Sequence, residues 1–154
     1  MAYLAAGATA PDFSLLDQQQ QTISLSELLK TNRVLVYFYP KAMTPGCTVQ
    51  ACSLRDSKAE LAQKGITVVG ISTDAPARLA KFTERDQLNF TLLSDEDHKI
   101  AEAFGVWGEK KFMGKVYDGI HRISFLIAQD GKVEHVFDNF KTKDHHQVVL
   151  NYLA

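Results

Sequence analysis

The sequence is poor in cysteine, in net charge and in long apolar runs. Its 154 residues include only two cysteines, and the formal net charge at neutral pH is −1. Two cysteines cannot build a disulfide framework, and a chain of this length buries a core without one. The balanced charge offers no general attraction for nucleic acid or anionic lipid. No stretch approaches the roughly 18 apolar residues of a membrane-spanning helix, so we expect neither a nucleic-acid nor a membrane partner.

Features that would divide the chain are also absent. There is no internal repeat, low-complexity block or Pro/Ser-rich linker, so we expect one domain covering residues 1–154. The opening MAYLAAGATA has alanines typical of a signal-peptidase site, but it lacks a basic region and Gly7 interrupts its short apolar stretch. We therefore expect a cytoplasmic protein. Thiols stay reduced there, and a cysteine pair is more often catalytic, redox-active or metal-binding than structural.

Hydrophobic patterning in the first two thirds predicts alternating strands and helices. FSLLDQQQQTISL is typical of a hairpin, and SLSE at 24–27 is a capping box that opens a short helix. RVLVYFY at 33–39 is an apolar run typical of a strand buried on both faces. The next predicted elements are a helix from Pro45 or Gly46 to Lys64, a strand at 66–72, a helix at 76–86, a strand at FTLLSD and a short helix at DHKIAEAFG.

The last third is expected to begin with a long loop, VWGEKKFMGKVYDG at 106–119. HRISFLI and KVEHVF then flank AQDG, which indicates an antiparallel hairpin, and a final amphipathic helix is expected at about Thr142 to Leu153. This order of elements predicts an α/β protein with a thioredoxin-like fold. In that fold a central mixed β-sheet is flanked by helices, here with an N-terminal β-hairpin.

Both cysteines lie in PKAMTPGCTVQAC at 40–52, directly after the strand predicted at 33–39. Cys47 falls in the first turn of the predicted helix, where unpaired N–H groups and the helix dipole favour the thiolate, the reactive form of a thiol. Pro40 stiffens the approach to this helix. The Thr44 hydroxyl can turn towards the sulfur or towards an oxygen of a bound substrate.

The spacing of Cys47 and Cys52 is unusual for a disulfide. On a regular helix, residues five apart are separated by about 7.5 Å along the axis and roughly 140° around it. Their Cα atoms would be about 8.5 Å apart, beyond the roughly 7 Å limit for a disulfide. The two thiols therefore bridge only if the helix start unwinds. For Cys52 alone, a role as a small buried hydrophobe is an equally good interpretation.

A zinc site is a third possibility for the thiols. It would need further soft ligands, and the candidates are His121, His135, His145 and His146. The last two are adjacent and point to different faces, and there is no second cysteine pair. We therefore predict no metal.

The stretch YPKAMTPGCTVQAC resembles the peroxiredoxin motif Pro-x-x-x-Thr-x-x-Cys, matched by Pro40, Thr44 and Cys47. A second cysteine five residues later is similar to the PrxQ branch, also called the bacterioferritin comigratory proteins. The resemblance covers nearly the whole chain, including GATAPDFSL, GISTD, FTLLSDED, GVWGEK and GIHRISFLI. The sequence departs from many relatives at Ala42 and Met43, where they carry polar or acidic residues, and we expect this to alter the pocket rim or the partner surface.

The resemblance implies a role for each matched residue. Cys47 would be the peroxidatic cysteine, Cys52 the resolving cysteine, and Arg122 the arginine that reaches the thiolate from a neighbouring strand. The implied activity is a thioredoxin-dependent, atypical two-cysteine peroxidase. It would reduce hydrogen peroxide and organic hydroperoxides through a sulfenic acid, form an intramolecular Cys47–Cys52 disulfide, and need no cofactor. Because such a disulfide needs no second subunit, we expect a monomer.

Two other functions remain open from the residues alone. A general thiol-disulfide oxidoreductase would act on protein thiols, although such enzymes favour two residues between their cysteines. A redox-sensing or holdase module would instead expose a binding surface when the helix unwinds, with negligible turnover.

Overall fold

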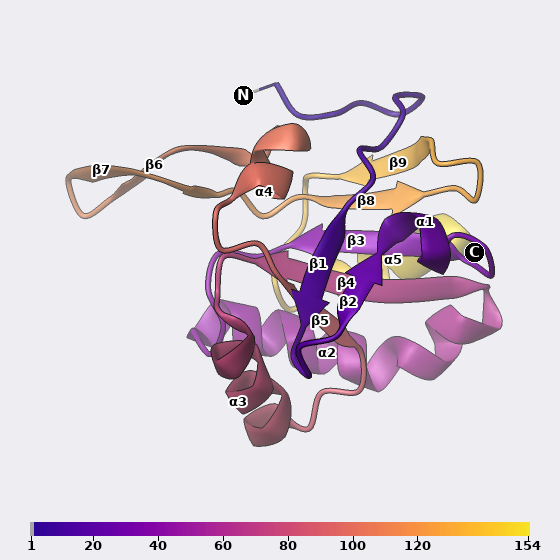
Figure 1. Cartoon of the computed structure of the whole chain (residues 1–154), viewed down its shortest axis with the longest axis horizontal. Coiled ribbons are helices and arrows are strands. Elements are labelled where there is room, and N and C mark those ends of the chain that lie inside the picture. The colour runs from indigo at the N-terminus through magenta and orange to yellow at the C-terminus, as the bar shows by residue number, and fades with distance from the viewer. Residues whose placement is uncertain (1) are drawn as a thin grey trace.

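The computed structural model describes residues 2–154. A seven-stranded sheet has the strand order β2-β1-β5-β4-β3-β8-β9, and β6 and β7 form a separate two-stranded sheet (Figure 1). The strands are β1 (Ser14–Asp17), β2 (Thr22–Ser24), β3 (Arg33–Phe38), β4 (Ile66–Ser72), β5 (Thr91–Ser94), β6 (Trp107–Phe112), β7 (Lys115–Ile120), β8 (Ser124–Ile127) and β9 (Val133–Phe137). The helices are α1 (Leu25–Leu28), α2 (Pro45–Gln63), α3 (Pro76–Asp86), α4 (Lys99–Ala103) and α5 (His145–Leu153).

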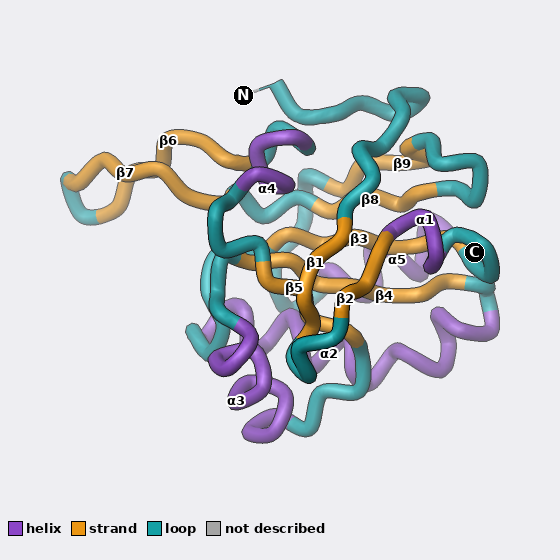
Figure 2. The backbone as a smooth tube through the Cα atoms, viewed as in Figure 1, coloured by secondary structure: helices purple, strands orange, loops and turns teal. Residues whose placement is uncertain are grey.

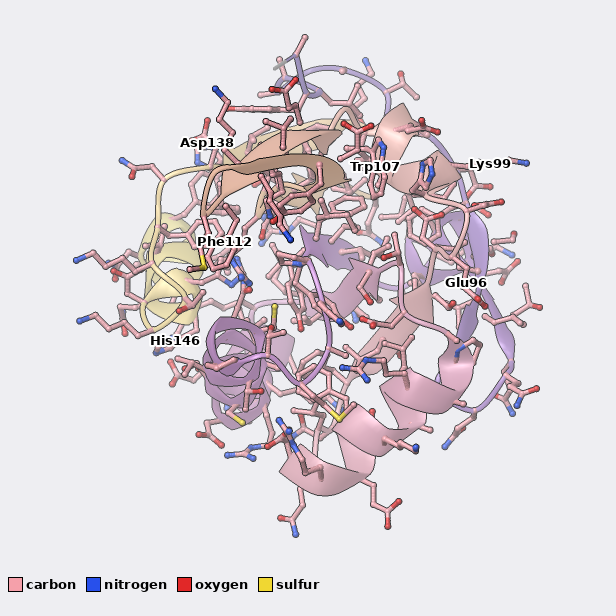
Figure 3. All side chains as sticks on the ribbon, turned by 90° about the vertical axis from the view of Figure 1, so that its left-hand side faces the viewer. Glu96, Lys99, Trp107, Phe112, Asp138 and His146 are labelled. Atoms are coloured by element: carbon pink, nitrogen blue, oxygen red, sulfur yellow. The ribbon has the colours of Figure 1, made fainter. Side chains whose placement is uncertain are left out.

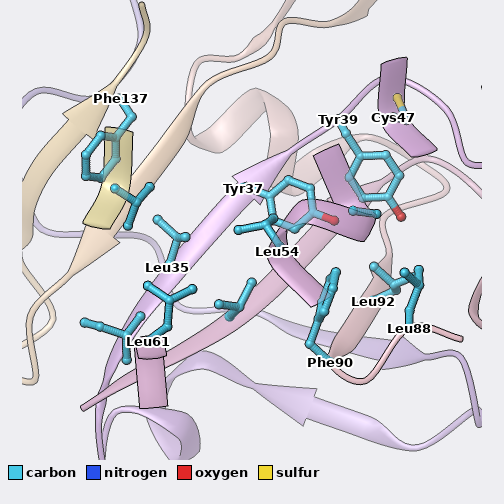
Figure 4. Packing of buried hydrophobic residues seen from close by; sticks show 14 of the residues in the cluster. Leu35, Tyr37, Tyr39, Cys47, Leu54, Leu61, Leu88, Phe90, Leu92 and Phe137 are labelled. Atoms are coloured by element: carbon cyan, nitrogen blue, oxygen red, sulfur yellow. The ribbon is translucent and has the colours of Figure 1, made fainter. Parts of the chain in front are cut away.

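The main sheet is mixed and covered on both faces. Strand β3 pairs in parallel with β4 and antiparallel with β8. Its alternate residues enter two different apolar clusters, as the two-residue period of a strand requires. Leu35 and Tyr37 pack with side chains from α2, α3 and α5, whereas Val34 and Val36 pack with side chains from α1 and α4 (Figure 4 shows the first cluster). The predicted thioredoxin-like arrangement, with a central mixed sheet between helices, is confirmed.

The predicted N-terminal hairpin is present as β1 and β2. The Asp17 carboxylate holds its turn together, because Oδ1 accepts hydrogen bonds from the N–H groups of Gln19 and Gln21. The predicted cap of α1 also forms, with Ser24 Oγ accepting from the Glu27 N–H at 3.4 Å. Within residues 2–154, no helix combines the length and apolar character needed to cross a membrane.

The prediction of a long loop at 106–119 was wrong, because most of this segment forms the antiparallel pair β6–β7. The turn between the strands contains Met113 and Gly114, both in the left-handed region, with φ of 51° and 81°. Among the strands of residues 2–154, these two pair only with each other, and Figure 2 shows the pair extending away from the main sheet. Neither strand is buried along one face, so the alternation that identifies a strand is missing.

The last helix also begins later than predicted, at His145 instead of Thr142. The Asp144 carboxylate accepts a hydrogen bond from the Lys141 N–H at 2.7 Å, which closes a turn over the residues expected to be helical. The first residue of the helix is fully buried, and its Nε2 lies 2.8 Å from Ser124 Oγ. The His145 ring also packs against Phe140, so α5 is attached to β8 through a polar pair in an apolar setting.

The buried His145 predicts a loss of stability in acid. Burial lowers its pKa from 6.5 to about 3. The folded protein disfavours the charged ring. The free energy of unfolding is therefore highest above about pH 6.5, and it falls by a few kcal/mol as the pH is lowered towards 3. Urea unfolding at pH 7 and pH 4.5 should show this fall in the native chain and a smaller one in His145→Gln. His146→Gln, the comparison variant, keeps the buried pair of His145 and Ser124 and removes only the smaller effect of the neighbouring ring on this pKa, so it should retain most of the native fall.

Candidate active site

The reactive thiol lies where the chain passes from β3 into α2. Thr44 is the extended N-cap residue, and Pro45 occupies the first turn of the helix. The first backbone bond of the helix runs from the Thr48 N–H to the Thr44 carbonyl at 2.9 Å, so the N–H groups of Gly46 and Cys47 lack helical partners. Cys47 is only 2% exposed, and Figure 4 shows it at the edge of the apolar cluster, beyond Tyr39.

A permanent positive charge lies beside this sulfur. Arg122 Nη1 is 3.5 Å from Cys47 Sγ and donates to Gln50 Oε1 at 2.7 Å. Arg122 lies two residues before β8, and β8 pairs with β3, so the sheet order brings residue 122 back beside the start of α2. A Cβ placed on Gly46 would lie 3.6 Å from Arg122 Nη2, which shows how closely the guanidinium approaches the helix backbone. A cation at this distance stabilises negative charge on the sulfur.

Gln50 is a site residue that the sequence reasoning missed. It is fully buried one turn after Cys47, and its carbonyl oxygen holds the arginine in place. The sequence does place Gln50 on the same face of the helix as Cys47, because residues three apart on a helix share a face. Only the position of Arg122 in the fold shows what that face contacts.

The loop before α2 is clamped by residues that follow β4. The Ala42 N–H donates to Asp74 Oδ2 at 2.8 Å, and Arg78 Nη2 donates to the Ala42 carbonyl at 3.0 Å. Asp74 and Arg78 also form an ion pair at 3.2 Å. Ala42 is completely buried, so the expectation that it would alter the pocket rim is not met at this position. Met43 adopts a left-handed conformation, with φ of 66°, and packs against the core.

Pro40 and Thr44 lie on the accessible side of this loop. The Thr44 hydroxyl donates to the Lys41 carbonyl at 2.8 Å and does not cap the helix. Both residues line a cavity of about 340 Å³. The other lining residues come mainly from the β6–β7 pair and its flanks: Trp107, Lys110, Tyr117, Asp118, Gly119 and Ile120, with Lys41 and Thr73.

The β6–β7 pair therefore forms one wall of this cavity, and Pro40 and Thr44, from the loop that leads to Cys47, line it as well. Trp107 contributes from the base of the pair, whereas Phe112, at the far end of β6, is 65% exposed and does not line the cavity (Figure 3). Lys110 places a cation on this wall, and its Nζ donates to the Ile120 carbonyl at 2.8 Å. Burial, and to a smaller extent the charge of Arg122, lowers the pKa of Lys110.

Cys52 is half-buried on another face of α2. Burial raises the pKa of its thiol, and the neighbouring charges are those of Arg55, Asp86, Asp56 and Arg85. Arg55 and Asp56 also form an ion pair with each other. Both thiols are free, and α2 is continuous through both positions, so the separation calculated for a regular helix applies.

The other candidate sites lack a reactive thiol or a set of metal ligands. Within residues 2–154, no group of three or more His, Cys, Asp and Glu side chains is placed to hold a metal ion. A larger cavity of about 510 Å³ lies at the other end of α2, beside Gln18, Lys58 and Asn89, and neither thiol lines it. The reactive chemistry is therefore concentrated at the start of α2.

Comparison with known proteins places the chain in a family. Residues 6–136 match the model of the AhpC/TSA family. The chain is 66% identical to peroxiredoxin Bcp of Escherichia coli over 150 residues, which are 97% of this chain and 96% of the relative. It is 44% identical to peroxiredoxin Bcp of Bacillus subtilis, over 90% and 88% of the two chains.

Solved structures agree with these relatives. The peroxidoxin BcpB of Mycobacterium tuberculosis matches with a TM-score of 0.87 and 39% identity, over 97% of this chain and 96% of that chain. A bacterioferritin comigratory protein of Xanthomonas campestris, studied for its alkyl peroxide reduction activity, matches with a TM-score of 0.85 and 29% identity, over 92% and 89%.

The contact between Gln50 and Arg122 predicts the reactivity of Cys47. Gln50→Met keeps the buried volume but removes the acceptor that orients the guanidinium. We expect alkylation of Cys47 by iodoacetamide at pH 7 to slow by roughly tenfold, the equivalent of one charged hydrogen bond of ordinary strength. Gln63→Met, at the exposed end of the same helix, is the matched control. An unchanged alkylation rate in Gln50→Met would contradict the positioning role.

Proposed function

The chain belongs to the AhpC/TSA family as a peroxiredoxin of the Bcp and PrxQ type, and on that premise we propose the route by which it acts as a thiol peroxidase. Cys47 reduces hydrogen peroxide and organic hydroperoxides, Cys52 resolves the product, and thioredoxin supplies the electrons. The observation that carries this proposal is the Arg122 guanidinium 3.5 Å from the Cys47 sulfur, at the start of α2. The alkyl peroxide reduction studied in the Xanthomonas campestris relative supports the inclusion of organic substrates.

In the first step the Cys47 thiolate attacks the terminal oxygen of the hydroperoxide. The S–O bond forms as the O–O bond breaks, giving a sulfenic acid and an alkoxide or hydroxide that takes up a proton. Ionisation alone is not enough. An ordinary thiol of pKa about 8.5 is roughly 3% ionised at pH 7, so complete ionisation gains only some 30-fold, or about 2 kcal/mol. The remaining acceleration must come from groups that align the peroxide and stabilise charge in the transition state.

Those groups are already beside the sulfur. Arg122 and the unpaired N–H groups of Gly46 and Cys47 are donors for the oxygens that gain charge. The Thr44 hydroxyl donates its proton to the Lys41 carbonyl, so its oxygen keeps lone pairs that accept the O–H of the incoming hydroperoxide. Pro40 covers the approach to the sulfur and limits the access of water.

The second step requires a change in shape. The sulfenic acid of Cys47 and the thiol of Cys52 condense to a disulfide with loss of one water molecule. Both residues lie within α2, too far apart to bridge, so its first turns must unwind. A thioredoxin dithiol then reduces the disulfide, restores both thiols and becomes a disulfide itself. Because both cysteines lie in one chain, we also propose that a monomer completes the cycle.

A coupled assay with thioredoxin, thioredoxin reductase and NADPH tests this cycle. The native chain should consume NADPH when peroxide is added, and Cys47→Ser should abolish the consumption. Cys52→Ser should still reduce one equivalent of peroxide but should fail to turn over with thioredoxin. Insulin reduction without peroxide would instead indicate a general oxidoreductase, and stoichiometric oxidation without turnover would indicate a sensor or holdase.

The raised pKa of Cys52 predicts a pH dependence for disulfide formation. The attacking form is the thiolate, and a raised pKa means that little thiolate is present near neutrality. The rate of disulfide formation after one equivalent of peroxide should therefore rise between pH 6 and pH 8, by up to about tenfold per pH unit. Stopped-flow tryptophan fluorescence measures this phase, with Cys52→Ser as the control that lacks it. A flat profile over this range would contradict attack by a Cys52 thiolate as the step that limits the rate.

A further inference from the structure

Helix α3 contacts α2 on both sides of Cys52. Thr48, Cys52 and Arg55 are spaced four and three residues apart, so they share one face of α2. On this face, Arg85 Nη2 donates to Thr48 Oγ1 at 2.9 Å, and Arg55 Nη1 donates to the Asp86 carbonyl at 2.6 Å. The end of α3 therefore spans the resolving cysteine, with one contact on the Cys47 side and one on the other. Figure 1 shows the two helices on the same side of the sheet.

More hydrogen bonds hold α2 to α3 and the segment after it beyond Cys52 than on the Cys47 side. Beyond Cys52, α2 has three hydrogen bonds to the end of α3 and the segment after it: Arg55 to Asp86, Asn89 Nδ2 to the Arg55 carbonyl, and Lys58 Nζ to the Asn89 carbonyl. On the Cys47 side, Arg85 to Thr48 is the one such side-chain bond from α3 within residues 2–154. Unwinding from the start of α2 therefore has to break one side-chain bond to α3, between Arg85 and Thr48, before it reaches Cys52. The three hydrogen bonds beyond Cys52 hold the rest of the helix.

Arg85 is held in the conformation that reaches Thr48. Its Nε pairs with Asp86 Oδ2 at 2.9 Å, and its guanidinium carbon lies 6.0 Å from the centre of the buried Phe82 ring. Its side chain is 48% exposed, so water replaces the Thr48 hydroxyl readily when the bond opens. The contact is therefore preorganised and also easy to release.

We propose that Arg85 is a positioning residue for the resolution step. Its bond to Thr48 keeps the first turns of α2 wound while Cys47 reacts, and its release lets the Cys47 sulfenic acid reach Cys52. This proposal rests on the intramolecular disulfide of the proposed function. While the helix stays wound, a second hydroperoxide can oxidise the sulfenic acid to a sulfinic acid, with release of water or an alcohol. The Arg85 contact therefore sets the balance between disulfide formation and overoxidation.

The test removes each half of the contact with a matched control. Arg85→Ala removes the donor, and Lys81→Ala makes the same charge change on an exposed residue one turn earlier in α3. Thr48→Val removes the hydroxyl, and Thr48→Ser keeps it. Stopped-flow fluorescence with one equivalent of peroxide separates oxidation of Cys47 from disulfide formation. Mass spectrometry after excess peroxide measures the sulfinic acid.

We expect disulfide formation to be about threefold to tenfold faster in Thr48→Val, the factor that corresponds to one hydrogen bond of ordinary net strength. The gain in Arg85→Ala should be smaller, because the charge of Arg85 lowers the pKa of the Cys52 thiol and its loss leaves less thiolate. The peroxide concentration that half-overoxidises Cys47 should rise by a similar factor, while the first phase stays within about twofold of native. Thr48→Ser and Lys81→Ala should match the native chain. The double variant Arg85→Ala/Thr48→Val should be no faster than either single variant, because both remove the same bond.

The outcomes separate this proposal from the one on which it rests. If the native chain forms no Cys47–Cys52 disulfide, the proposed function fails, and the role of Arg85 fails with it. If the native chain forms the disulfide but Arg85→Ala and Thr48→Val resolve at the native rate, only the role of Arg85 is overturned. Additive effects in the double variant would likewise show that the two residues do not act through one bond. Should Arg85→Ala fail to fold, the Thr48→Val and Thr48→Ser pair still decides.

Discussion

Arg122 brings a permanent positive charge within 3.5 Å of a sulfur that is only 2% exposed, and much of the architecture serves to keep that pair together. A guanidinium that is partly withdrawn from water is costly unless its hydrogen bonds are satisfied, which gives the fully buried Gln50 its importance. The antiparallel pairing of β8 with β3 returns residue 122 to the start of α2. The clamp on Ala42 fixes the loop that leads into the helix. Each of these contacts restricts where the sulfur and the cation can lie.

The same segment has to satisfy two opposed requirements. Attack on a peroxide needs a wound helix start, with free N–H groups and a cation beside the sulfur, whereas closure of a disulfide needs that helix start to open. Gln50 lies between the two cysteines and ties this helix start to Arg122, so opening the helix as far as Cys52 also disturbs the contact that orients the cation.

The sequence predicted the main sheet because β3 and β4 are apolar on both faces, and it predicted the thiol's helix from the T-P-G preceding Cys47. Other features were beyond the reach of patterning. The β6–β7 pair has no continuous buried face, so its strands carried no alternating signal. Gln50 contacts Arg122, which is 72 residues away in the sequence, and Thr48 contacts Arg85, which is 37 residues away. Such contacts can be found only once the fold is known. The burial of Ala42 likewise depends on Asp74, which arrives from the far end of β4.

The separate sheet formed by β6 and β7 has a consequence for how this protein can change. These strands share no hydrogen-bonded register with the seven-stranded sheet, yet they supply Trp107, Lys110 and Tyr117 to the cavity wall. The pairing of β3 with β8, on which the placement of Arg122 depends, does not involve the exposed side chains of these strands. The cavity wall and the sulfur–cation pair therefore rest on different sheets, so side chains exchanged on the wall change the shape of the cavity without changing the strands that hold the pair.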